Sequence, residues 1–282
     1  SEEHPLTSRV MANRLWQWHV GEGLVRSPDN FGRLGLRPTH PELLDFLAIR
    51  FQELGWSMKE MHRLIMCSST YRMSSEWNQE YTARDPENKL IWRMPRRRLS
   101  AEEIRDALLA VGNNLDLSFG GTLLPTPNRA YVTSTANVDV KVYETRRRSI
   151  YLPVVRSALY SMFQVFDFAE PSVPQGQRQT TNIASQALFI MNSKIVIEQA
   201  EALAQDVLTD DSMEDEVRVD KLFMKLFGRV ARDGERLSCI SHIDQYQKAL
   251  AESDVPAEMH LSTSWQSLCR ALLASNEFIY LD

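Results

Sequence analysis

The chain has 282 residues, with 32 Lys and Arg against 37 Asp and Glu, so its net charge is −5. This acidic balance argues against a dedicated nucleic-acid-binding domain, which is normally basic. No segment reaches the roughly 18 consecutive apolar residues of a membrane span. The three cysteines lie too far apart for a zinc knuckle or a haem attachment motif. We therefore expect no cofactor in this domain, no nucleic-acid partner and no membrane span.

Helix signals dominate the first part of the chain. Met11 and Leu15 share one face of a predicted helix over residues 8–20, which ends at Gly21. Three capping boxes follow, in which a Ser or Thr hydroxyl accepts from the backbone N–H three residues on and a Glu reaches back. They are Thr39 with Glu42, Ser57 with Glu60, and Ser100 with Glu103. The helices after the first two boxes predict an αα-hairpin, with a left-handed C-cap at Gly55.

One β-like island interrupts the helices. Val138, Val140 and Val142 alternate with polar residues, and "RRRSIYLPV" alternates as well, which predicts a small antiparallel hairpin or meander near residues 130–154. Further helices are predicted at 154–167, 183–208 with a break at Asn192–Ser193, 215–227, 234–251 and 264–275. The fold class is therefore mainly α.

The domain organisation follows from this pattern. We predict a single mainly helical domain over residues 1–282, with possible lobes at 1–117 and 154–282 joined by the β-like island 118–153. The first residues, "SEEHPLTSRV", have neither the basic end nor the apolar stretch of a signal peptide. We therefore expect a fragment of a longer protein.

Three consecutive arginines, Arg96 to Arg98, precede the helix that Ser100 opens. Positive charge at a helix N-terminus opposes the helix dipole, but the first turns also carry acidic side chains that suit it. These are Glu102, Glu103 and Asp106. A salt-bridged start of the helix is the favoured interpretation, and an acidic partner or ligand is the alternative.

Recognisable catalytic strings are absent. There is no nucleophile elbow, phosphate loop, dinucleotide fingerprint or H-E-x-x-H zinc motif. The six histidines never fall three or four residues apart, so no local metal pair exists. His19 ends its helix beside Trp16 and Trp18, where a protonated ring suits the helix dipole. It is a weak catalytic candidate, and the metal site prediction is none.

The most site-like segment spans residues 167–192. Asp167 and Glu170, weak catalytic candidates, end one helix, and the start of the next offers free N–H groups that suit a carboxylate, sulfate or phosphate. Candidate anion- or partner-binding residues are Arg147, Arg148, Arg178, Thr180, Thr181, Gln186 and Asn192. The structural alternative is a Thr181 or Asn182 N-cap, with Asp167 paired with Arg178 or Arg148. In this alternative Gln186 and Asn192 are buried amides that satisfy the loop backbone.

The ordered motifs of the chain are similar to those of a known family. They are "HPLTSRVMANRLWQWHVGEGLV", "PTHPELLDFLAIRF", "GWSMKEMHRLIMCSSTYRMSS", "WRMPRRRLSAEEIRDALLAV", "RRRSIYLPVVR", "FDFAEPS" and "TTNIASQALFIMN". In this order they resemble the planctomycete and verrucomicrobial domain of unknown function 1553. The resemblance implies the C-terminal part of an exported, periplasmic or cell-surface protein, associated with cytochrome c segments and polysaccharide degradation. Trp18 stands where that family usually has His, which weakens a catalytic role there.

Two functions of different classes remain open. The first is a non-catalytic binding or assembly module for another domain of the same polypeptide or an exported partner protein. The second is a hydrolase or lyase acting on acidic or sulfated polysaccharide, with arginines holding anionic groups and Asp167 or Glu170 as acid or base. Mutual burial of the arginines, Asp167 and Thr181 favours the module, and an open cleft with an unpaired carboxylate favours the enzyme.

Overall fold

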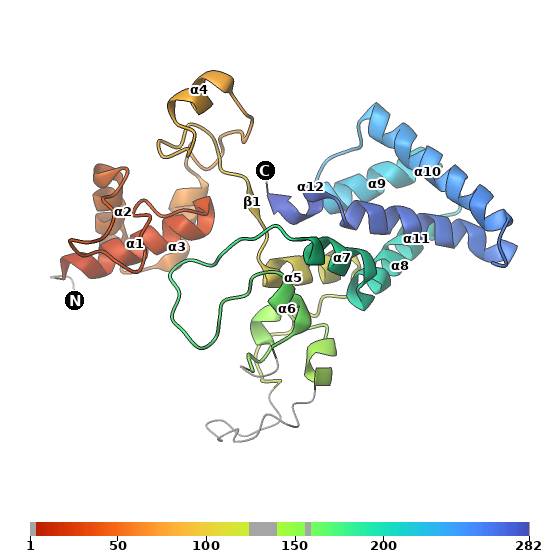
Figure 1. Ribbon diagram of the computed structural model, residues 1–282, viewed down its shortest axis with the longest axis horizontal. Helices are drawn as coiled ribbons and strands as arrows, with labels where there is room; N and C mark the ends of the chain where they lie inside the picture. The colour runs from red at the N-terminus through yellow and green to blue at the C-terminus, as the bar shows by residue number, and fades with distance from the viewer. Residues whose placement is uncertain (1–3, 124–139, 156–158, 282) are drawn as a thin grey trace. The chain divides into compact units, whose positions relative to one another are not determined.

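A computed structural model describes residues 4–123, 140–155 and 159–281 (Figure 1). Their contacts divide the chain into two compact units. The N-terminal unit comprises residues 1–97 and 173–178, and the C-terminal unit comprises residues 98–172 and 179–281. The predicted single domain with lobes at 1–117 and 154–282 stays a prediction. No helix in the described part of the chain has the length and apolar character needed to cross a membrane.

The described part of the N-terminal unit, residues 4–97 and 173–178, contains four helices. They are α1 (Pro5–Val20), α2 (Pro41–Glu53), α3 (Met58–Met66) and α4 (Gln79–Arg84). Proline stands in the first turn of α1 and α2, where its missing N–H costs no hydrogen bond. The core lies between α1, α2 and α3 and includes the fully enclosed Leu15 and Met61.

The predicted αα-hairpin of α2 and α3 is confirmed. Gly55 turns it with φ = 63°, and Ser57 caps α3 by accepting from the Glu60 N–H at 3.3 Å. The box predicted at Thr39 is wrong, because Pro41 begins α2 and makes His40 the N-cap. The Thr39 hydroxyl instead donates to the Leu24 carbonyl at 3.3 Å.

The C-terminal unit holds the larger core, in which Trp265 and Leu203 are fully buried. Helices α8 and α11 pack against each other, and α10 packs on α11. Its helices are α5 (Ala101–Val111), α6 (Ser161–Val165), α7 (Ala184–Asn192), α8 (Lys194–Leu208), α9 (Asp215–Phe227), α10 (Asp233–Ala251), α11 (His260–Leu273) and α12 (Asn276–Ile279). The break predicted at Asn192–Ser193 is confirmed as the junction of α7 and α8.

The mainly α-helical class with one small β element is confirmed, but the sheet lies elsewhere in the chain. Strands β1 (Arg97–Arg98) and β2 (Tyr280–Leu281) form it. Val140–Glu144 and Ser149–Tyr151 are 3₁₀ turns instead of strands, and residues 130–139 of the predicted hairpin lie outside the described residues. Loop 145–149 forms a single parallel β-bridge, between Arg147 and Asp116, and bonds to side chains of α5, as described below.

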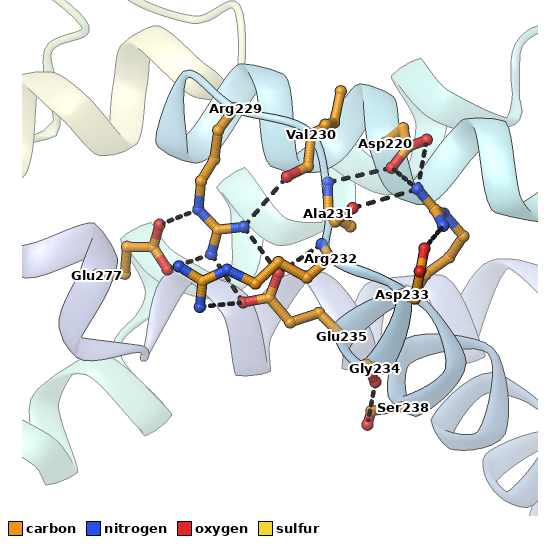
Figure 2. A network of polar contacts seen from close by, with 11 residues as sticks. Asp220, Arg229, Val230, Ala231, Arg232, Asp233, Gly234, Glu235, Ser238 and Glu277 are labelled. Atoms are coloured by element: carbon orange, nitrogen blue, oxygen red, sulfur yellow. Dashed lines mark hydrogen bonds and ion pairs between the residues drawn. The ribbon is translucent and has the colours of Figure 1, made fainter.

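The connection between α9 and α10 is held by the ion pairs in Figure 2. Arg229 donates to both carboxylate oxygens of Glu235, at 2.7 and 2.8 Å. It also donates to both oxygens of Glu277 in α12, at 2.7 and 2.8 Å. The hydrogen bonds from Arg229 lower the pKa of Glu235 to about 2. One guanidinium therefore ties the start of α10 to α12.

We expect Glu235→Gln to lower the melting temperature by a few degrees at neutral pH. The pKa of Glu235 is lower in the folded than in the unfolded chain, so its ionised form stabilises the fold above the ordinary value of 4.5. That contribution disappears as the pH falls through about 2. The pair is partly exposed, so about 1 kcal/mol is the expected size. Melting curves from neutral to acid pH test this, with Glu201→Gln on the exposed side of α8 as the control.

Candidate functional site

The segment between α6 and α7 closes around a carboxylate. Asp167 follows α6 with φ = 56°, a left-handed conformation that Asp tolerates better than most residues. The carboxylate accepts from the N–H of Thr181 (2.8 Å to Oδ2) and from its hydroxyl (2.8 Å to Oδ1). Nη2 of Arg98 donates to Oδ2 at 2.6 Å. The segment between α6 and α7 and the distant Arg98 therefore meet at one carboxylate.

Gln186 in α7 completes this arrangement. Its Oε1 accepts from Nη1 of Arg98 at 3.0 Å, and its Nε2 donates to the Val165 carbonyl at 3.1 Å. Arg98 also donates to the Thr181 carbonyl. The Gln186 amide thus satisfies the loop backbone, as its sequence position predicts. We call Arg98, Asp167, Thr181 and Gln186 the carboxylate cluster.

The carboxylate cluster is poorly accessible to water. The side chain of Arg98 is 5% exposed and that of Asp167 is 16% exposed. Burial by itself raises the pKa of Asp167, but the Thr181 N–H, the Arg98 guanidinium and the Thr181 hydroxyl together outweigh it and lower the pKa. A general acid needs a raised pKa, and a general base needs a lone pair that reaches substrate. Asp167 is ionised and its two oxygens already accept hydrogen bonds within the protein.

The partner predicted for Asp167 needs correction. Arg98 forms the ion pair, in place of the predicted Arg178 or Arg148. Of the three arginines before α5, Arg98 thus pairs outside that helix. The predicted capping box is confirmed, because Ser100 accepts the Glu103 N–H and Glu103 accepts the Ser100 N–H.

The predicted N-cap of α7 is also wrong. The helix begins at Ala184, so Ile183 is the N-cap and neither Thr181 nor Asn182 holds that position. The hydroxyl of Thr181 is bonded to Asp167 instead. The sequence predicts an anion-binding site ahead of this helix. In the structure the Asp167 carboxylate of the same chain is the anion that Thr181 binds.

The predicted arginine pair of the 145–151 loop does not converge on Asp167. The Arg147 guanidinium lies over the Tyr151 ring, 3.9 Å from its centroid, and donates to the Ser118 carbonyl at 3.1 Å. Arg148 is exposed. The arginine that organises this loop is Arg105, to which the sequence analysis assigned no role.

Arg105 in α5 is 1% exposed, and its guanidinium faces the backbone of the loop. It donates to the Arg147 carbonyl at 2.8 Å, to the Ser149 hydroxyl at 3.2 Å and to the Thr145 carbonyl. Asp106 accepts from the Ser149 N–H at 2.8 Å and from its hydroxyl at 2.7 Å. Burial lowers the pKa of Arg105, although neighbouring Tyr160 and Asp106 oppose that shift. Arg105 and Asp106, adjacent residues of α5, thus hold the loop in place.

Two other predicted site residues of the C-terminal unit bond within their own segments. The exposed Glu170 accepts from the Ser172 N–H at 3.1 Å. Asn192 is exposed and donates to the Leu188 carbonyl at 2.9 Å. Arg178 and Thr180 are exposed, and Arg178 belongs to the N-terminal unit. Within the C-terminal unit, the structure therefore brings together Asp167, Thr181 and Gln186 of the predicted set.

A histidine pair forms a second polar cluster, in the N-terminal unit. Nε2 of His19, in the last turn of α1, lies 2.7 Å from Nδ1 of His62 in α3, so one ring donates to the other. The Tyr71 ring meets His19 edge-on at 5.5 Å. Burial lowers the pKa of His19, and the charges of His62 and Arg97 add to this effect. This direction opposes a protonated ring at the end of α1.

We expect the unfolding free energy to fall as the pH drops below about 6.5, the ordinary value for histidine. The lowered pKa of His19 means that the unfolded chain binds this proton more readily than the folded chain. His19→Gln, which does not titrate, should flatten this part of the pH profile. Melting temperatures between mildly alkaline and mildly acidic pH measure it, and the exposed His4→Gln is the control. An unchanged profile in His19→Gln would contradict the assignment.

Metal-ligating side chains do not gather in the described residues. Across 4–123, 140–155 and 159–281, no group of three or more His, Cys, Asp or Glu side chains lies close enough to hold an ion. Cys239 and Cys269 are buried, and burial raises their thiol pKa values to about 11 and about 12. Neither thiol is therefore an activated nucleophile.

Comparison with known proteins gives one match. The family model described as "PSD1: Protein of unknown function (DUF1553)" matches residues 1–243. No curated protein matches the chain, and no solved structure does.

Proposed function

Since the chain belongs to the DUF1553 family, whose description names no activity, we propose from its own contacts that it is a non-catalytic binding and assembly domain. Its partner is another domain of the same polypeptide or an exported partner protein. It forms the C-terminal part of a larger exported protein, periplasmic or on the cell surface, that takes part in polysaccharide degradation or redox chemistry. This setting rests on the motif resemblance described above.

The internal bonding of Asp167 is the observation that carries this proposal. Both of its oxygens accept hydrogen bonds from Thr181, and Arg98 pairs with it. The alternative, a hydrolase or lyase of acidic polysaccharide, requires a carboxylate that reaches substrate. Asp167 is instead only 16% exposed and bonds to Arg98 and Thr181 of its own chain. A satisfied buried polar network of this kind makes the local structure rigid and unique.

A thermal-shift titration separates the two functions. The ligands are sulfate, phosphate and a panel of sulfated and uronic-acid oligosaccharides, with Arg178→Ala in parallel. A ligand at a hundred times its dissociation constant adds about 2.7 kcal/mol, enough to raise the melting temperature by several degrees. We expect no saccharide-specific shift. A shift that Arg178→Ala abolishes, accompanied by turnover of the saccharide, would replace the assembly domain with the enzyme.

The positive test is chemical crosslinking of the native protein followed by mass spectrometry. An assembly domain yields reproducible crosslinks from its surface lysines to one other domain or one exported protein. Lys194, 81% exposed at the start of α8, is the lysine best placed to report on the face described next. Crosslinks confined to this domain would contradict assembly.

A further inference from the structure

Helix α7 carries an apolar stripe that the described residues of its own unit leave exposed. Its exposed residues are Ala184, Ala187, Leu188 and Met191, spaced i, i+3, i+4 and i+7, so they share one face. Leu188 is 60% exposed and Met191 is 54% exposed. In a surface helix, the face that points away from the core is normally polar. We call these four residues the α7 stripe.

The opposite side of α7 holds the helix in place. Ile190 and Gln186 are buried, and the Phe189 ring packs edge-on against Phe166 at 5.8 Å. Arg270 of α11 donates to the Met191 carbonyl at 2.7 Å and so satisfies the end of the helix. The α7 stripe is therefore an apolar surface on an anchored helix.

The Met191 end of the α7 stripe lies beside positively charged side chains. Residues 183–194 contain no Asp or Glu, whereas Lys194 and the exposed Arg270 stand beside the Met191 end. Lys194 is 81% exposed, and its contact with Glu198 at 3.6 Å is a surface pair that contributes little. The Met191 end thus presents positive charge beside an apolar face.

We propose that the α7 stripe docks an amphipathic helix of the assembly partner, with apolar side chains at three- and four-residue spacing and Asp or Glu beside Met191. This inference rests on the proposed assembly function and identifies its contact face. A nine-residue helix gives a stripe about 13 Å long, which matches roughly two turns of a partner helix. A second copy fits poorly, because its own α7 offers no acidic residue to Lys194 or Arg270.

Two synthetic fluorescein-labelled peptides test the proposal. Both are amphipathic helices with Leu at three- and four-residue spacing, and one ends in two Glu where the other ends in two Lys. Fluorescence anisotropy with the intact chain measures both affinities. We expect the Glu peptide to bind about threefold to tenfold more tightly, which is the range for rim charge pairs. Lys194→Glu should remove or reverse this preference.

Leu188→Glu is the variant for the apolar contact, and we expect it to weaken binding of the Glu peptide by tenfold or more. Leucine and glutamate have similar helix propensities and Leu188 is exposed, so an unchanged melting temperature is expected. The matched control is Leu237→Glu, because Leu237 is 69% exposed on α10.

Three outcomes would overturn the proposal. They are equal binding of both peptides, binding that Leu188→Glu leaves unchanged, and self-association of the chain that Leu188→Glu abolishes. The first two would leave the assembly function intact if crosslinks from other lysines still reach one partner. Absence of crosslinks to any partner would instead remove the assembly function itself.

Discussion

Asp167→Asn is expected to lower the free energy of unfolding by about 3 kcal/mol, because it leaves the buried Arg98 guanidinium without its counter-charge. Asparagine tolerates the left-handed backbone at this position, so the change isolates the loss of charge. In a chain of this size the melting temperature should fall by roughly 6–12 °C. Denaturant unfolding and thermal melts measure both quantities.

The same substitution distinguishes an internal role from a catalytic one. A catalytic carboxylate would be replaced with little loss of stability, whereas the carboxylate cluster predicts a large loss. Glu170→Gln is the control, since Glu170 is exposed nearby in sequence and should change stability by less than about 1 kcal/mol. In a double-mutant cycle, Arg98→Met combined with Asp167→Asn should cost less than the sum of the single changes. Simple additivity would show that the two side chains act independently.

Arg105→Met is the second substitution with a large expected effect. It should lower the free energy of unfolding by about 3–5 kcal/mol. The variant leaves the Arg147 and Thr145 carbonyls without their donor in a buried setting. Arg105→Lys should restore only part of the loss, because an ammonium cannot reproduce the planar fork that reaches several acceptors at once. Thermal melts give the loss, and hydrogen exchange of residues 145–151 shows whether the loop opens with it.

Arg148→Met is the matched control for this prediction. It removes an exposed arginine from the same loop and should change the unfolding free energy by less than about 0.5 kcal/mol. If both variants proved equally mild, the loop would be held by Asp106 and Ser149 rather than by the guanidinium of Arg105.

The helices were predictable because their signals are local. The capping box of Ser100 and Glu103 and the left-handed Gly55 each act within one turn of the chain, and both are confirmed. The alternating pattern before Val154 led to the wrong prediction of strands there. A period of two indicates a half-buried strand only where a neighbouring strand exists. Here side chains of α5 bond the loop instead.

The polar clusters were only partly predictable, because their partners are distant in sequence. Asp167, Thr181 and Gln186 lie in one segment and were predicted together, but Arg98 lies 69 residues before Asp167. Arg105 did leave a signal, since it stands on the helix face of Ala101, Ile104 and Leu108, where an arginine must find internal acceptors. The pair of His19 and His62, 43 residues apart, leaves no such signal at short spacing.

The long sequence separations in the carboxylate cluster also bear on the folding and unfolding rates of the protein. Contacts of Arg98 span 69, 83 and 88 residues, so the chain must close large loops before any of them forms. We expect contacts of such long separation to form after the folding transition state, in which case their loss mainly speeds unfolding. The cluster would then contribute chiefly to the lifetime of the folded domain.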